Sequence, residues 1–111
     1  MKTAVHVIVL LALSAVFSFS RADSAADDAA INALGNANGV ALACKLQESA
    51  ARLKTLMIGH VPKTRANGEV FEQATNAAFL RQHQGLACPS ATDMQARVDT
   101  LESRLVAHFK P

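Results

Sequence analysis

The chain has 111 residues, half of them hydrophobic, and a formal net charge of +2 at pH 7. The excess positive charge comes from Lys2 and Arg21, because basic and acidic side chains balance from Asp23 onward. A nucleic-acid binder gathers basic residues on one face in order to neutralise phosphates. Since the charges are interspersed here, we expect no binding to nucleic acid or to an anionic membrane surface.

Residues 1–22 have the features of a cleaved signal peptide. Lys2 provides a positive start, an apolar run of about 16 residues follows, and Ser20-Arg21-Ala22 offers small residues where a signal peptidase cuts. The run is shorter than the roughly 20 residues of a membrane-spanning helix. We therefore expect cleavage after Ala22, a periplasmic or secreted mature protein, and no stable membrane insertion after cleavage.

Residues 23–111 are expected to form a single helical domain, because about 89 residues suffice for one small core. Acidic residues near Asp23 suit the positive end of a short helix over residues 23–34. Asn36, Asn38 and Gly39 predict a break directly after that helix. Alanine-rich chain ends are often frayed, so flexibility of residues 23–39 is left open.

Three longer stretches show the 3.6-residue periodicity of amphipathic helices. They cover residues 40–58, which Gly59 ends, residues 69–84, which Gly85 ends, and residues 92–109. Thr92 and Gln95 predict a capping box at the start of the third. The apolar stripes of these helices are the expected core: Ala43, Leu46, Ala50, Leu53, Met57, Val70, Phe71, Ala74, Ala77, Ala78, Met94, Val98, Leu101, Leu105 and Phe109.

The connection over residues 59–68 is rich in Gly, Pro and Asn, and no segment alternates as a strand does. We therefore expect an all-α fold. It is a small antiparallel bundle of three long helices, with a short additional helix at its amino-terminal side. In such a bundle the first and third long helices run parallel, so their amino-terminal ends lie together.

Cys44 and Cys88 are the only two cysteines of the chain. In an oxidising compartment an isolated pair of cysteines usually forms a disulfide. The sequence has neither the Cys-x-x-Cys of a redox pair nor the closely spaced Cys and His ligands of a zinc site. Both cysteines fall near the amino-terminal ends of the parallel helices, so we expect them to be joined.

His60, His83 and His108 each fall in or just after the last turn of an expected helix. A cation is favoured there by the helix dipole, which explains these positions without a ligand. His60 and His108 would share one end of the bundle and are weak candidates for a transition-metal site. Because no two histidines have the spacing of helical metal ligands, we expect no metal and no cofactor.

Catalytic motifs are missing from the sequence. It contains no Gly-x-Ser-x-Gly turn, no glycine-rich phosphate loop and no free thiol with a histidine partner. Glu69 and Glu72 lie at the expected start of a helix, where they compensate the helix dipole. We therefore expect that the protein is not an enzyme. An enzyme with no recognisable motif is kept only as a third hypothesis, after the two binding functions described next.

Phe79 is the candidate for a partner contact, because it lies outside the apolar stripe of its helix, beside Leu80. The leading hypothesis is a small exported helical protein that binds another protein as an adaptor, an inhibitor, an immunity-like factor or a periplasmic chaperone. The alternative is a carrier of a small ligand or a metal. Self-association is left open by the sequence.

The gross plan of the chain is similar to that of the small acid-stress chaperones of the bacterial periplasm. They are also exported, helical and of similar length, and one disulfide holds them. No motif of this sequence places it in that family. The resemblance implies a fold class and a compartment, and it assigns no role to any residue.

Overall fold

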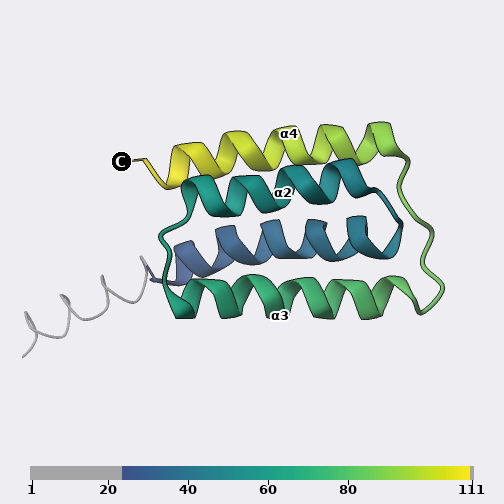
Figure 1. Cartoon of the computed structure of the whole chain (residues 1–111), viewed down its shortest axis with the longest axis horizontal. Coiled ribbons are helices and arrows are strands. Elements are labelled where there is room, and N and C mark those ends of the chain that lie inside the picture. Colours follow the sequence, from purple (N-terminus) through teal and green to yellow (C-terminus); the bar gives the residue numbers. More distant parts are fainter. Residues whose placement is uncertain (1–23, 111) are drawn as a thin grey trace, which may run out of the picture.

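The computed structural model describes residues 24–110, which form a bundle of helices (Figure 1). Residues 24–43 are helical throughout, and we call them the leading helix. α2 spans Gln47–His60, α3 spans Arg65–Gln82 and α4 spans Ala91–His108. Successive helices run in opposite directions, so α2 is parallel to α4. The expected all-α bundle is confirmed, whereas the predicted signal peptide lies outside the described residues.

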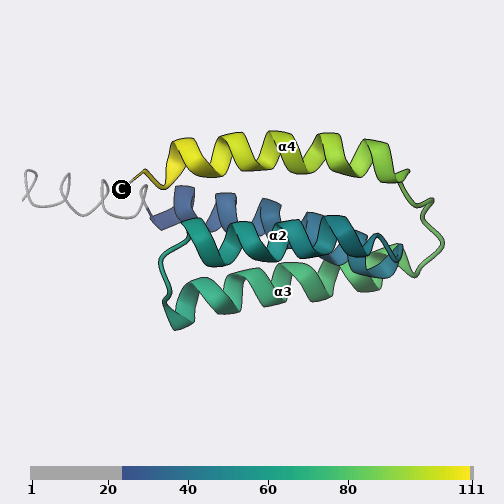
Figure 2. The same cartoon turned by 45° about the horizontal axis from the view of Figure 1, so that its top comes forward.

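The leading helix is longer than expected, and the predicted break at residues 36–39 is wrong. The chain leaves the helix only at residues 44–46, where Lys45 has a positive φ of 59°. Between residues 34 and 41 the helix is buried on most of its circumference, as in a helix at the centre of a bundle. Figures 1 and 2 show it bordered by α2, α3 and α4. This burial outweighs the preference of Asn and Gly for turns, which amounts to about 1 kcal/mol per residue.

Gly35 and Gly39 allow the leading helix to lie very close to α3. A Cβ atom added at Gly35 would lie 2.7 Å from the carbonyl oxygen of Phe71 and 2.8 Å from the Cβ of Ala74. One added at Gly39 would lie 2.7 Å from the Cβ of Ala78. These separations are shorter than van der Waals contact, so both glycines are packing residues in the middle of a helix.

Hydrogen bonds between polar side chains also stabilise the crossing of the leading helix and α3. The Asn38 amide, only 3% exposed, donates a hydrogen bond to the Thr75 hydroxyl over 3.2 Å. The Thr75 hydroxyl in turn lies 3.2 Å from the carbonyl oxygen of Gly35 and 2.8 Å from that of Phe71. Because buried polar groups are costly unless they are paired, these bonds favour one register of the two helices.

The core lies mainly among the leading helix, α2 and α4. Its buried members are Ile31, Leu34, Ala37, Ala41, Ala50, Leu53, Leu56, Val61, Met94, Val98 and Leu105. Val70 and Phe71 of α3 pack against this cluster from the side. The predicted core stripes of α2 and α4 are largely correct. In α3, Ala77 was predicted to be buried but is exposed. The core residues of the leading helix were not predicted from the sequence.

The starts of α3 and α4 differ from the predicted ones. α4 is capped by Ser90, whose side chain accepts a hydrogen bond from the backbone N–H of Asp93, so the capping box at Thr92 is wrong. α3 begins at Arg65 rather than at residue 69, because the Thr64 side chain caps it. In both cases a hydroxyl that comes earlier in the sequence satisfies the free N–H groups of the first turn.

The predicted disulfide between Cys44 and Cys88 is confirmed, with a Cα–Cα distance of 5.7 Å. Cys88 lies in the connection before α4, near the amino-terminal end of that helix as expected, whereas Cys44 lies in the connection after the leading helix and not inside a helix over residues 40–58. Both connections are at the end of the bundle where α2 and α4 begin (Figure 1). The disulfide therefore joins two interhelical connections and closes one end of the bundle.

Replacing Cys44 and Cys88 with serine should lower the free energy of unfolding by about 4 kcal/mol, because the unfolded chain gains the entropy of an open loop. Urea denaturation with and without reductant measures this loss. Reductant should move the wild-type midpoint to that of the double variant and leave the variant unchanged. Two alkylatable thiols in unreduced wild-type protein would contradict the disulfide.

Gly39→Ala should destabilise the protein by roughly 1–3 kcal/mol, because the new methyl group overpacks the crossing with α3. Gly68→Ala is the matched control, since no atom lies within 4 Å of a Cβ added there in the first part of α3. The control should stabilise the protein by about 0.5–1 kcal/mol through helix propensity alone. Thermal unfolding of both variants measures the contrast, and equal shifts would refute the close crossing.

Candidate functional site

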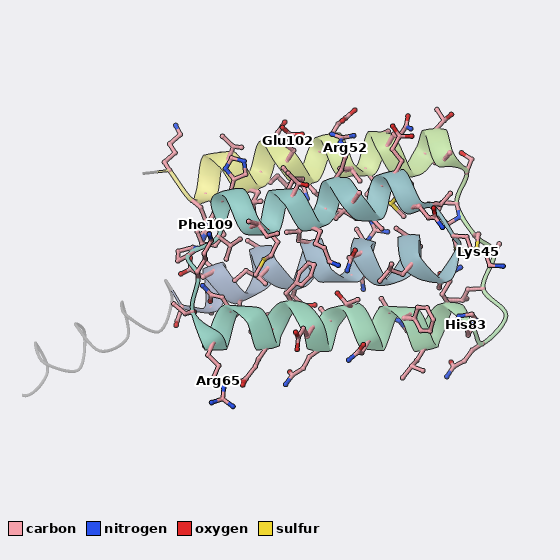
Figure 3. All side chains as sticks on the ribbon, in the orientation of Figure 1. Lys45, Arg52, Arg65, His83, Glu102 and Phe109 are labelled. Atoms are coloured by element: carbon pink, nitrogen blue, oxygen red, sulfur yellow. A yellow bond between two sulfur atoms is a disulfide. The ribbon has the colours of Figure 1, made fainter. Side chains whose placement is uncertain are left out.

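An open groove of about 830 Å³ lies at the end of the bundle where α2 and α4 finish. Its walls come from the last turn of α2, the connection to α3 and the last turn of α4, and we call it the α2–α4 groove. The apolar and basic side chains that line it are Ile58, Val61, Pro62, Val106, Phe109, His60, Lys63 and Lys110. Figure 3 shows Phe109 at this end of the bundle, opposite the end that carries Lys45.

The apolar side chains of the groove range from buried residues of the core to exposed residues at the surface. Val61 is buried and Phe109 is half-buried against the core, whereas Ile58 is 60% exposed and Val106 is 41% exposed. Leu56 takes the core position at the end of α2, so Ile58 points to the outside. Apolar side chains gathered in an exposed hollow are typical of a contact surface.

The ionisable side chains that line the groove are all basic. Lys63, Lys110 and His60 line it, and among residues 24–110 no Asp or Glu does. Within residues 24–110 neither lysine forms a salt bridge, whereas His108 nearby pairs with Asp27 at 2.6 Å. The groove therefore combines an apolar floor with a positive rim.

Arg52 connects the two helices that form the groove. Its guanidinium donates to Asp99 of α4 over 2.8 Å and to Glu102 over 3.1 Å (Figure 3). The hydrogen bond to Asp99 is the main cause of a raised pKa of Arg52. The structure therefore shows an interhelical bridge near the middle of the two helices. This bridge helps to hold α2 in place against α4.

The predicted weak metal candidates, His60 and His108, end α2 and α4 at the same end of the bundle. Their surroundings differ, because His60 lines the α2–α4 groove while His108 pairs with Asp27 and packs edge-on against Phe109. In the part of the chain that the structure describes, no three His, Cys, Asp or Glu side chains are grouped to hold a metal ion. A site built on these two histidines stays a prediction.

Phe79, the predicted partner contact, lies near the opposite end of the bundle, in the last part of α3. Its side chain is 37% exposed and packs edge-on against the ring of His83, with ring centroids 4.5 Å apart. Leu80 and Leu86 are more than half exposed near the same end. Phe79 is therefore accessible, and its contact with a partner stays a prediction.

Of the residues that line the α2–α4 groove, only His60 and Phe109 were identified from the sequence. A usable signal was present, because Ile58 and Val106 are large apolar residues that lie outside the core stripes of their helices. The same signal did single out Phe79. Nothing in the sequence brings the two groove residues together, because their proximity depends on the parallel packing of α2 and α4.

The described helices and the comparisons with other proteins add no functional assignment. Within residues 24–110 no helix is long and apolar enough to cross a membrane. Comparisons with protein-family models, with curated proteins and with solved structures found no match. No residue role is therefore carried over from a relative, and function has to be inferred from the shape, apolar side chains and charges of the groove.

Proposed function

We propose that this chain is a small exported helical protein that binds another protein through the α2–α4 groove. The observation that carries the proposal is the exposure of Ile58 and Val106 together in one open groove. Burying such a side chain completely contributes about 1.5–3 kcal/mol, so two of them can anchor a partner. An adaptor, an inhibitor, an immunity-like factor or a chaperone would each use such a surface.

The openness of the groove favours a macromolecular partner over a small ligand. Small-molecule sites commonly bury about 70–90% of the ligand, which requires walls on most sides. The α2–α4 groove is formed by two helix ends and one connection, so the remaining walls would come from the partner. A carrier function, the alternative, would better use the smaller groove of about 290 Å³ between the leading helix and α4.

The disulfide supports export as part of the proposal, because such bonds persist in oxidising compartments. A helical bundle of this size has a small core, so the disulfide compensates for limited burial. Such a chain can present apolar side chains at one end without relying on them for folding. The proposed binding surface and the proposed compartment are therefore compatible.

A photo-crosslinking amino acid placed at Ile58 or Val106 should give a discrete adduct with a protein in the native cell envelope or culture medium. The same amino acid at Ser103, which is exposed on α4 outside the groove, is the matched control and should give none. Ile58→Ser should remove the adduct at Val106 while its thermal midpoint stays close to the wild type. Adducts that are equal at all three positions would refute the proposal.

Export predicts that the mature protein begins at Asp23. Intact-mass measurement of protein from the envelope or the medium should match residues 23–111 with two hydrogens missing, because the disulfide is formed. Ala22→Arg, which removes one of the two small residues that the signal peptidase reads, is expected to retain the precursor, whereas Ser24→Ala beyond the site should be processed normally. Full-length chain found only inside the cell would contradict export.

A further inference from the structure

We infer that the partner segment is acidic, with two apolar side chains flanked by Asp or Glu; this inference rests on the proposed function. The segment would lay its apolar residues on Ile58 and Val106 and its carboxylates beside Lys63 and Lys110. These four residues all line the α2–α4 groove.

The sign of the rim is uniform. Lys63 follows the end of α2, Lys110 follows the end of α4, and both are exposed. Two acidic side chains at this end of the bundle are already engaged, because Asp27 pairs with His108 and Glu69 pairs with Arg65. Since no Asp or Glu of residues 24–110 lines the groove, a partner that brings its own carboxylates meets complementary charge.

The helix ends oppose this attraction only in part. α2 and α4 both finish at the groove, and each carboxyl end carries a partial negative charge of about half an elementary charge. In each helix, one carbonyl of the last turn already accepts a hydrogen bond. In α2 the Val61 N–H donates to the Met57 carbonyl, and in α4 the Phe109 N–H donates to the Leu105 carbonyl. Each lysine carries a full charge on a flexible side chain, so the rim remains positive.

The apolar anchors come from different helices. Ile58 belongs to the last turn of α2 and Val106 to the last turns of α4, so a bound segment has to lie across both helix ends. The lysines flank this path from the connection after α2 and from the residues after α4. An apolar pair with acidic residues on either side therefore matches the groove in both shape and charge.

Two synthetic helical peptides test the inference. They share two leucines one turn apart, and the flanking positions are Glu in one peptide and Lys in the other. Binding to the full mature chain is measured by fluorescence anisotropy at low and high salt. The Glu peptide should bind roughly tenfold more tightly at low salt, and the difference should shrink at high salt as the charges are screened.

Charge reversal at the groove provides the matched variants. The double variant Lys63→Glu with Lys110→Glu should reverse the preference in favour of the Lys peptide. Lys54→Glu, at an exposed position of α2 outside the groove, should leave the preference as in the wild type. Ile58→Ser should weaken binding of the Glu peptide without changing the sign of the preference. Circular dichroism melting of each variant checks that the bundle is folded.

The outcomes separate this inference from the proposed function. Equal binding of the two peptides, binding of neither, or an unchanged preference in the double variant overturns the acidic partner. Crosslinking at Ile58 and Val106 could still succeed in each case, and the proposed function would then stand without it. Displacement of the Glu peptide by micromolar dodecanoate, with direct dodecanoate binding, also overturns the inference, because the groove would then bind an anionic amphiphile.

Discussion

The close crossing of the leading helix and α3 determines how the bundle is built. Gly35 and Gly39 remove the side chains that would otherwise separate the two backbones, and Ala74 and Ala78 meet them from α3. Because the leading helix is buried between its neighbours, α2 and α4 can pack on its other sides and share one core with it. α3 contributes few large side chains to that core, so its attachment depends on close contact and on the bond between Asn38 and Thr75.

One covalent and one noncovalent link hold the bundle together at different places. At one end the disulfide joins the connections that follow the leading helix and α3, which limits how far these connections can separate. Near the middle of the bundle, α2 and α4 are linked by the noncovalent bridge from Arg52 to Asp99 and Glu102. Surface ion pairs contribute little stability, commonly below about 1 kcal/mol, so this bridge mainly orients the helices. The exposed groove lies at the end without the covalent bond.

The proposed function follows from this division. Side chains at the covalently closed end and along the centre stabilise the fold, and Ile58 and Val106 contribute little to it because they are exposed. In the proposed function these exposed apolar residues bind the partner, and the basic residues beside them would select its charge. Phe79, near the other end, is also accessible, as are Leu80 and Leu86, and its ring packs against that of His83.

The sequence by itself determined the helical fold class, the approximate extents of α3 and α4, the approximate end of α2, most of their core stripes, and the pairing of Cys44 with Cys88. These features depend on local periodicity and on there being only two cysteines, and both can be read along the chain. The helix predicted from residue 40 was wrong at its start, because residues 40–43 belong to the leading helix and α2 begins at Gln47. Only the tertiary structure decided that residues 36–39 continue a helix, that Arg52 bridges α2 and α4, and that Ile58 lies near Val106. The physical reason is that burial between neighbouring helices overrides the local preference of glycine and asparagine. Contacts between residues about fifty positions apart, such as Arg52 with Glu102, arise only when the helices pack.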